Sequence, residues 1–270
     1  MTKVVLVVCD GLGYQQARDW FGYLEGLVEA GAASAWKGQA QLPTNSRPNY
    51  ESILTGLAPT DHGIVANELH GIGSASPNIF GIASESDLVT GAVAYHWVSE
   101  LYNTTGRFDP MVDVECDDPS LPIQHGRFYF TDDHPDEHVF ATAMRLTAVH
   151  QPDFLLVHPM GVDAVGHALG RPNDAYRLQV KKQDVLLSLA IPIWRASGYA
   201  VIVTADHGHD DLHQHGGTTS DERDVPVYLV DGSGGGARDE VVSNLSIAPT
   251  VLTHLGLEVP ASMAAPVLPA

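Results

Sequence analysis

The sequence is poor in cysteine and in basic residues. Only two cysteines, Cys9 and Cys116, occur in 270 residues and no motif pairs them, which is typical of a reducing compartment. Lysine and arginine number 14 against 33 aspartates and glutamates, so the formal net charge is −19. A surface this acidic repels phosphate backbones, and we therefore expect no binding to a nucleic-acid polymer.

Long apolar runs are also missing. No run reaches the ~20 residues that a membrane-spanning helix requires. The best candidate, residues 185–205, is interrupted by Pro192 and Arg195. At the N-terminus the apolar run from Val4 is short and meets Asp10 at once, unlike a signal peptide. We therefore expect a soluble, cytoplasmic protein without a membrane partner, and its oligomeric state stays open.

Short apolar runs alternate with helical patterns along the chain. Near-continuous β-branched runs are typical of strands buried on both faces of a parallel sheet. Such strands are expected at residues 4–8, 90–95, 154–157, 199–204 and 225–230. Helices are expected at residues 14–30, 135–150, 173–196 and 245–255. This alternation predicts an α/β/α sandwich with a mostly parallel central sheet, formed by a single domain over residues 1–270.

Two segments depart from this alternation. Between residues 98 and 133 the periodicity fades while glycine, proline and aspartate accumulate, which indicates a small cap over the site. Residues 232–236 have the sequence Gly-Ser-Gly-Gly-Gly, which is typical of a flexible surface loop.

An aspartate follows each of three predicted strands. Asp10, Asp163 and Asp206 come after the runs at residues 4–8, 154–157 and 199–204. Ligands bind at the carboxyl ends of the strands in sheets of this kind. We therefore expect the three carboxylates to converge on one edge of the sheet, although aspartates at strand ends also serve as turn formers and helix caps.

Histidines lie beside these aspartates, and the chain has 14 of them. His167 stands four residues after Asp163, His207 directly follows Asp206, and His213 and His215 come shortly afterwards. Carboxylates and imidazoles without thiolates favour Zn²⁺, with Mn²⁺ or Fe as alternatives. Because these ligands are too many for one tetrahedral zinc, the sequence predicts two metal ions.

A serine stands near the start of another predicted helix. Pro48 early in this segment, before Ile53 and Leu54, predicts a helix whose N-terminus lies near Ser46. Helix N-termini bind phosphate, and a serine there can become a nucleophile when a base or a metal lowers its pKa. The alternative is that Thr44 or Ser46 is only the N-cap.

Five motifs in this order resemble the alkaline phosphatase superfamily and, within it, the type I phosphodiesterase/nucleotide pyrophosphatase family. They are Asp10 after the first strand, Thr44-Asn-Ser46-Arg-Pro-Asn49, Thr55-Gly-Leu-Ala-Pro-Thr-Asp-His62-Gly-Ile-Val-Ala-Asn67, Asp163-Ala-Val-Gly-His167 and Thr204-Ala-Asp206-His207. The closing Ser246-Ile-Ala-Pro-Thr-Val-Leu252 also fits. The resemblance implies the fold of alkaline phosphatase and two zinc ions.

The resemblance also implies roles for individual residues. Asp163, His167 and His215 would hold one metal, with His213 as the alternative to His215. Asp10, Ser46, Asp206 and His207 would hold the other. Ser46 would be the nucleophile, and Asn67 would donate to a phosphoryl oxygen. His62, His158 and His209 match no ligand position and are expected to be structural.

The implied reaction is hydrolysis of a small, anionic, phosphate-containing substrate through a phosphoseryl intermediate on Ser46. A phosphodiesterase or nucleotide pyrophosphatase is the first expectation. Two departures make nucleotide preference doubtful, because diesterases of this family usually carry threonine at the Ser46 position and nucleotide-hydrolysing members place an aromatic residue where Arg47 stands. Arg47 could bind a further anionic group of the substrate or could pair with Glu51 or Asp61.

Three other reactions stay open within the superfamily. They are phosphomonoester hydrolysis, cleavage of a phosphonate C–P bond as in phosphonoacetate hydrolase, and the isomerisation catalysed by manganese-dependent phosphosugar mutases. The phosphonate reaction would favour basic residues in the cap, which offers only Arg107 and Arg127. The mutases carry larger insertions than this chain.

Overall fold

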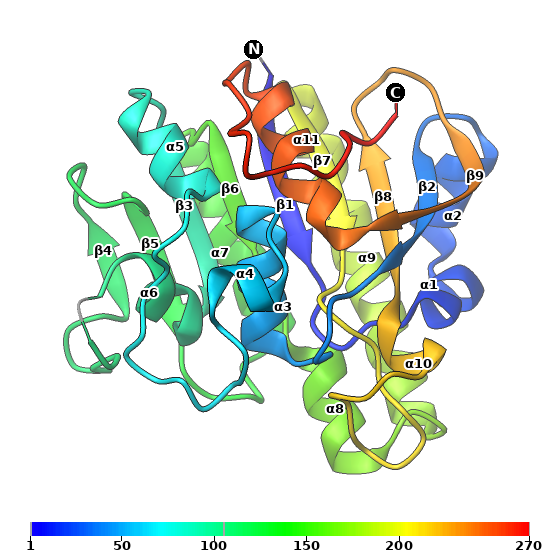
Figure 1. The fold of residues 1–270 in the computed structure, drawn as a ribbon. Helices are drawn as coiled ribbons and strands as arrows, with labels where there is room; N and C mark the ends of the chain where they lie inside the picture. The colour runs from blue at the N-terminus through cyan, green and yellow to red at the C-terminus, as the bar shows by residue number, and fades with distance from the viewer. Residues whose placement is uncertain (1, 105, 270) are drawn as a thin grey trace.

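The computed structural model describes residues 2–104 and 106–269. In this part of the chain, nine strands form one sheet in the order β4-β5-β3-β6-β1-β7-β8-β2-β9 (Figure 1). The strands are β1 Lys3–Val8, β2 Ser34–Gln39, β3 Thr90–Tyr95, β4 Glu115–Asp117, β5 His125–Tyr129, β6 Phe154–Val157, β7 Tyr199–Thr204, β8 Asp224–Val230 and β9 Gly236–Ser243.

Helices cover both faces of this sheet. They are α1 Tyr14–Trp20, α2 Gly22–Glu29, α3 Ser46–Thr55, α4 Pro59–His62, α5 Ile79–Glu85, α6 His96–Tyr102, α7 Asp136–Val149, α8 Gly161–Leu169, α9 Asp174–Ala196, α10 Ser220–Arg223 and α11 Ile247–His254, with a 3₁₀ turn at Asn244–Ser246. Side chains of α1, α2, α7, α8 and α9 pack on one face. Side chains of α3, α5, α6 and α11 pack on the other. The three-layer α/β/α sandwich expected from the sequence is therefore confirmed (Figure 1).

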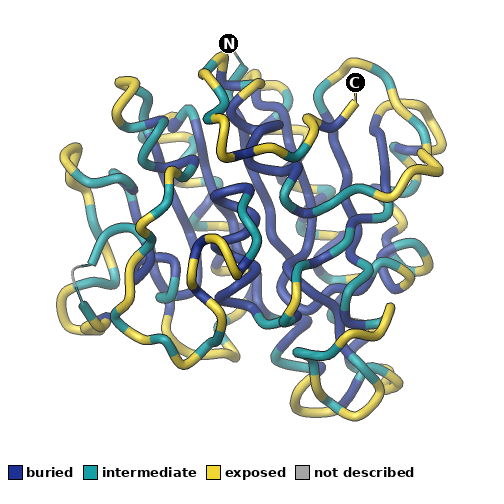
Figure 2. Tube along the Cα trace, viewed as in Figure 1, coloured by how far each residue is buried: buried dark blue, intermediate teal, exposed yellow. Residues whose placement is uncertain are grey.

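The centre of the sheet is parallel. Strand β1 pairs in parallel with β6 on one side and with β7 on the other, so that Leu6 lies between Leu156 and Ile202. Alternate residues of β1 enter opposite core layers, since Val5 and Val7 belong to one and Leu6 to the other. These strands lie in the buried interior of the fold (Figure 2). Burial on both faces explains why their sequences are continuously apolar.

The outer strands complete the sheet with mixed directions. Strand β8 is antiparallel to β7 and β2 is antiparallel to β8, whereas β9 is parallel to β2. At the other side, β5 is parallel to β3, and β4 is antiparallel to β5. The segment 98–133 therefore supplies two strands at one edge of the sheet, and the expectation that all of it forms a cap is corrected.

One expected helix and two strands also differ from the expectations drawn from the sequence. The helix expected at residues 14–30 is two helices, because the chain turns at Phe21, whose φ and ψ of −79° and 105° are extended. Strands β2 and β9 were not expected. The sequence of β2 includes Lys37 and a glycine, and β9 is an exposed edge strand with charged residues, so neither has the apolar pattern of a buried strand.

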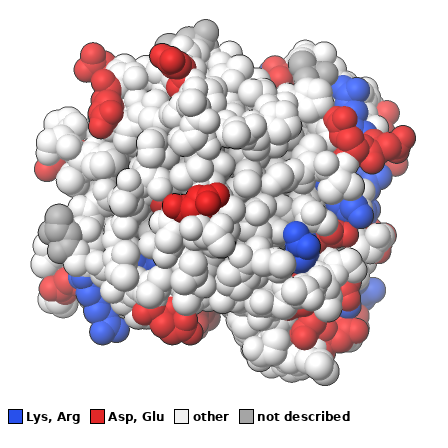
Figure 3. All heavy atoms as spheres, viewed as in Figure 1, with Lys and Arg blue, Asp and Glu red and all other residues white. Residues whose placement is uncertain are grey.

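The surface carries its acidic groups in scattered clusters. On the face shown in Figure 3, aspartates and glutamates occur at several separate places, while most lysines and arginines lie toward the side of β2 and β9. No continuous basic patch is visible on this face. Within the described residues, the helices are either too short or too polar to serve as a membrane span.

Candidate active site and metal centre

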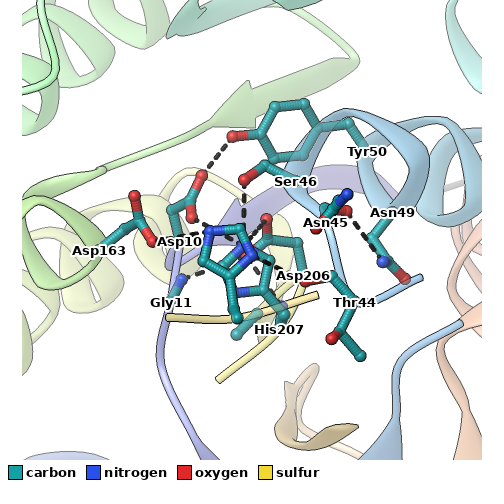
Figure 4. A network of polar contacts seen from close by, with 12 residues as sticks. Asp10, Gly11, Thr44, Asn45, Ser46, Asn49, Tyr50, Asp163, Asp206 and His207 are labelled. Atoms are coloured by element: carbon teal, nitrogen blue, oxygen red, sulfur yellow. Dashed lines mark hydrogen bonds and ion pairs between the residues drawn. The ribbon is translucent and has the colours of Figure 1, made fainter. Parts of the chain in front are cut away.

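Three aspartates meet at the carboxyl edge of the central strands. Asp10 follows β1, Asp206 follows β7, and Asp163 lies in the first turn of α8 after β6. Their exposed fractions are 0%, 0% and 3%. Because β6, β1 and β7 are neighbours and parallel, their ends deliver these side chains to one place (Figure 4).

Gly11 allows the close approach of two of these segments. Its φ is +73°, and a Cβ atom there would lie 2.8 Å from the Cα atom of Asp163. Its backbone N–H donates to Oδ1 of Asp206 at 3.2 Å. Only glycine combines this left-handed conformation with so close a backbone contact.

Ser46, Asp10, Asp206 and His207 form a group that we call the serine cluster. The Ser46 Oγ lies 3.0 Å from Nε2 of His207, and that nitrogen lies 3.3 Å from Asp206 Oδ2 and 3.5 Å from Asp10 Oδ1. His207 Nδ1 faces the carbonyl of Gly208 at 3.0 Å, which places the ring proton on Nδ1 and the lone pair on Nε2. Within the described chain, Asp10 Oδ1 and Asp206 Oδ2 have no hydrogen-bond donor.

This arrangement fits a cation. Three potential ligand atoms, from Asp10, Asp206 and His207, converge in a buried place. Buried acceptors of like polarity repel one another unless a positive charge lies among them. Carboxylate oxygens and an imidazole nitrogen are ligands that Zn²⁺ accepts.

Asp163, His167 and His215 form a second group, the histidine cluster. Nδ1 of His167 faces the carbonyl of His213 at 3.0 Å, and Nδ1 of His215 faces the carbonyl of Thr44 at 2.9 Å. Both rings therefore turn their Nε2 lone pairs inward, and these two nitrogens lie only 3.1 Å apart. Asp163 Oδ1 lies 3.5 Å from the first and 3.8 Å from the second. Two facing lone pairs beside a carboxylate again fit a cation.

Burial perturbs the titration of both clusters. Burial, assisted by the charge of Asp10, raises the pKa of Asp163 to about 7 and raises the pKa of Asp206 well above its usual value. Burial lowers the pKa of His207 to about 4 and that of His215 to about 3. His207 and His215 are thus neutral near pH 7, as metal ligation requires.

Asp10 differs from the other two carboxyls. Burial alone would raise its pKa, but a hydrogen bond from His158 and the nearby His207 lower the pKa of Asp10 below its usual value. His158 Nε2 lies 3.0 Å from Oδ2. The Tyr50 hydroxyl donates to the same oxygen (Figure 4). Oδ2 is therefore occupied, and Oδ1 is the oxygen that faces the serine cluster.

The helix carrying Ser46 begins as expected. The N-cap position of α3 belongs to Asn45, and the described chain shows no side-chain hydrogen bond that caps this helix. Thr44 Oγ1 donates to the carbonyl of Gly217, and Ser46 Oγ contacts His207. The alternative that Thr44 or Ser46 is only an N-cap is therefore wrong. Asn49 fixes the preceding loop, because its Nδ2 donates to the carbonyls of Pro43 and Asn45.

Asn67 lies beside the start of α3. Its Oδ1 accepts a hydrogen bond from the backbone N–H of Arg47 at 3.0 Å. Because Oδ1 is occupied in this way, the Nδ2 amide is the part of Asn67 that can donate to a phosphoryl oxygen. The structure therefore brings Asn67 next to the predicted nucleophile from a loop that lies 21 residues further along the chain.

Arg47 does not reach the site as expected. It is fully buried, and its Nη1 lies 2.5 Å from Oε2 of Glu100, which is also fully buried. Its Nη2 donates to the carbonyl of Ile72 at 3.0 Å. The interpretation of Arg47 as a substrate-binding residue is corrected: the side chain turns inward to a glutamate of α6. Among the described residues, no hydrogen bond or ion pair joins Arg47 to Glu51 or Asp61.

Three further histidines that the sequence analysis considered lie near the site or support its surroundings. His62 is structural as expected, since its Nε2 contacts Ser52 Oγ and its Nδ1 accepts from the backbone of Ile64. His213 lies outside both clusters, in agreement with the preference for His215. Sequence reasoning missed the position of His209, whose Nε2 lies 2.6 Å from Asp163 Oδ1 beside the histidine cluster. The sequence Asp206-His207-Gly-His209 could have indicated this position, because His209 stands two residues after a predicted metal ligand.

A third group of possible metal ligands lies elsewhere. Asp117, His125 and His150 approach one another at the β4–β5 edge of the sheet. Arg127 already pairs with Asp117, with Nη2 at 2.8 Å from Oδ2. This carboxylate therefore has a cationic partner, unlike those of the two clusters above.

Comparison with known proteins identifies relatives of the whole fold. GPI ethanolamine phosphate transferase 2 of Kluyveromyces lactis is 24% identical over 235 residues, which cover 84% of this chain and 29% of that protein. The chain thus spans less than a third of the length of this curated relative. Human ectonucleotide pyrophosphatase/phosphodiesterase 5 has a TM-score of 0.72 and 13% identity, with 96% of each chain covered. Alkaline phosphatase PafA has a TM-score of 0.74 and 12% identity, with 98% of each chain covered.

A family model extends over most of the chain and over both clusters. The model described as Type I phosphodiesterase / nucleotide pyrophosphatase matches residues 4–223, a range that includes every residue from Asp10 to His215 discussed above. Its match agrees with the solved structures, which share the fold. The chain therefore belongs to the type I phosphodiesterase/nucleotide pyrophosphatase family, whose members act on phosphoesters.

Proposed function

We propose that this chain is a metal-dependent hydrolase of phosphoric esters that uses Ser46 as its nucleophile. A phosphodiesterase or nucleotide pyrophosphatase reaction on a small anionic substrate is the first candidate. The observation that carries the proposal is the position of Ser46 Oγ, 3.0 Å from His207 Nε2 among the acceptor atoms of Asp10 and Asp206. A hydroxyl held there is placed for activation.

Two divalent cations, Zn²⁺ in the first instance and Mn²⁺ or Fe as alternatives, fit the two clusters. Asp10, Ser46, Asp206 and His207 would hold one, and Asp163, His167 and His215 would hold the other. When bound, the cations supply Lewis acidity, which lowers the pKa of the Ser46 hydroxyl and offsets negative charge on the phosphoryl oxygens of the substrate.

The chain's own residues account for two displacement steps. Ser46 Oγ loses its proton and forms a bond to phosphorus while the bond from phosphorus to the leaving oxygen breaks, and the leaving group takes up a proton. Water then attacks the phosphoserine, releases phosphate or a phosphate monoester, and returns the proton to Ser46. Asn67 Nδ2 donates to a non-bridging oxygen, where charge increases in each transition state.

Electrostatics make the cations necessary for substrate binding. The chain has a formal net charge of −19, and Asp10, Asp163 and Asp206 are buried at the edge of the sheet where Ser46 lies. Each of these carboxyls that is ionised would repel an anion by about 4 kcal/mol at ~4 Å and intermediate screening. We therefore expect no measurable phosphate binding by the metal-free protein.

A second candidate is transfer of the phosphoryl group to an alcohol. It is favoured by the similarity to proteins named GPI ethanolamine phosphate transferase 2, which extends over 84% of this chain. The first step on Ser46 would be the same, and an alcohol would take the place of water in the second. Adding alcohol acceptors to the assay distinguishes the two, because transfer gives a new ester in place of free phosphate product.

The test combines activity assays with metal analysis. Purified protein is assayed on aryl phosphate diesters and monoesters, with Ser46→Ala as the test variant and Ser52→Ala as a matched control. Ser52 lies on the same helix and is also buried, but it contacts His62 outside the clusters. We expect diester preference, about two zinc ions per chain, and a loss of at least about 10³-fold in Ser46→Ala only, because the covalent route is removed.

Other outcomes select the remaining reactions. Preference for monoesters would indicate a phosphomonoesterase, release of inorganic phosphate from phosphonoacetate would indicate a C–P hydrolase, and retention of phosphate on the product would indicate a mutase. Full activity in Ser46→Ala would reject Ser46 as nucleophile.

The cellular location is also part of the proposal. Cys9 is buried and Cys116 is half-buried, and both are free thiols. Free thiols agree with a reducing, cytoplasmic environment. Fractionation of cells that express the protein at its natural level tests this.

A further inference from the structure

The histidines around the site differ in what their second ring nitrogen contacts. His207, His167 and His215 each turn Nδ1 toward a backbone carbonyl, at 3.0, 3.0 and 2.9 Å. In each case the proton belongs on Nδ1, and Nε2 offers a lone pair to the interior. A metal-binding histidine is usually held by such a hydrogen bond from its other nitrogen.

His209 has the opposite arrangement. Its Nε2 lies 2.6 Å from Oδ1 of Asp163, and its Nδ1 is buried without a hydrogen-bond partner among the described residues. A proton on Nδ1 would be a buried donor without an acceptor, and the Nε2 lone pair would then face a carboxylate oxygen. Both consequences are unfavourable, so the proton belongs on Nε2, which donates to Asp163.

Packing holds the His209 ring in this position. The residue is fully buried. A Cβ atom on Gly166 would lie 2.7 Å from the ring, and one on Gly11 would lie 3.0 Å from it. The absence of a side chain at both positions therefore makes room for the His209 ring. The rings of His167 and Tyr176 meet it edge-on, with centroids at 4.7 and 6.4 Å. The donor therefore has one available direction, toward Asp163.

We propose that His209 is a positioning residue that holds the Asp163 carboxylate in place for the cation of the histidine cluster, and that it is not itself a ligand. This inference rests on the proposed function, since it concerns the metal centre. Its action is local, because Asp10 of the serine cluster has its own donors: His158 Nε2 at 3.0 Å and the Tyr50 hydroxyl. Loss of the His209 donor should thus weaken one of the two cations selectively.

Two variants separate positioning from ligation. His209→Met removes the donor and keeps an apolar side chain in the space, whereas His209→Gln keeps an N–H donor near the Nε2 position. Zinc affinity and stoichiometry are measured by competition with a chromophoric chelator, and His215→Gln is the comparison for a lost ligand. We expect one of two zinc ions to bind about 10–100-fold more weakly in His209→Met, as for other partners of metal ligands, and within a few-fold of wild type in His209→Gln.

The outcomes distinguish this inference from the proposed function. A wild-type protein that binds no zinc would reject the metal centre itself. Two zinc ions bound by His209→Met with wild-type affinity would reject the positioning role and leave the metal centre intact. Equal weakening in His209→Gln and His215→Gln would make His209 a ligand and overturn the inference.

A spectroscopic measurement covers the case in which His209→Met fails to fold. Circular dichroism of each metal-free variant establishes folding. Co²⁺ is then added to wild type and to His209→Gln, and the visible ligand-field bands are compared. Unchanged bands support a hydrogen-bonding role, while a shifted or weakened spectrum indicates loss of a nitrogen ligand and overturns the inference.

Discussion

The buried pair of Arg47 and Glu100 is expected to stabilise the fold beside the nucleophile. Both side chains are fully buried, with Nη1 and Oε2 2.5 Å apart. Glu100 also accepts from the backbone of Phe108 at 2.9 Å and of Gly71 at 3.3 Å. Removing one member of such a pair leaves an uncompensated buried charge, which costs about 3–5 kcal/mol. We expect Glu100→Gln to lower the free energy of unfolding by that amount.

A double-mutant cycle in urea tests this expectation. Arg47→Met and Glu100→Gln should each be strongly destabilising, but the double variant should be less destabilised than their sum because no unpaired charge remains. Asp174→Asn is the control, since its pair with Arg177 is at the surface, with side chains 82% and 46% exposed, and should contribute at most about 1 kcal/mol. Additive effects, or a loss in Glu100→Gln no larger than in the control, would refute the reasoning.

Acid should weaken the same pair. Burial would raise the pKa of Glu100, but hydrogen bonds from Arg47, Phe108 and Gly71 outweigh it and lower this pKa below its usual value of 4.5. The stabilisation is therefore present above pH 4.5 and is lost as the pH falls through the lowered pKa. Glu100→Gln should lose less stability than wild type over that range.

Three further predictions concern the site and its surroundings. Removing metals with a chelator should lower the melting temperature, since a ligand at 100 times its Kd stabilises by ~2.7 kcal/mol per site; an unchanged melting temperature in calorimetry would argue against bound metal. Asn67→Ala should reduce kcat/KM by about 10²–10³-fold with unchanged zinc content, as for loss of one oxyanion donor; a wild-type rate would exclude its contact with phosphate. Burial lowers the pKa of His62 to about 4 from 6.5, so the unfolded chain binds a proton there that the folded chain does not, and stability falls as the pH drops from 6.5 to 4. In urea unfolding, His62→Gln should reduce the dependence of the free energy of unfolding on pH over this range. An unchanged dependence would contradict the lowered pKa of His62.

The central strands could be predicted from the sequence because both of their faces are buried. Runs such as Val4–Val8 are apolar throughout. Strand β9 was missed because it is exposed and charged, so its pairing with β2 depends on the neighbour and not on its own pattern. The break in the first helix was missed because Phe21 and Gly22 fit the helical spacing of apolar residues.

The aspartates could be located because parallel strands deliver their ends to one edge. The position of Arg47 could not, because its partner Glu100 lies 53 residues away and nothing local indicates that the two meet. His209 is a similar case. Its contact with Asp163 depends on the packing of the His209 ring against Gly11 and Gly166, and only the folded chain reveals it.

The two clusters differ in their access to water, which has a kinetic consequence. The side chain of His167 is 43% exposed, whereas Asp10 and His207 are fully enclosed. An ion beside His167 would have a ligand that water reaches directly, while the residues that would hold an ion in the serine cluster are more enclosed. An ion in the histidine cluster should therefore exchange rapidly with trace metals of the medium, and an ion in the serine cluster should exchange more slowly.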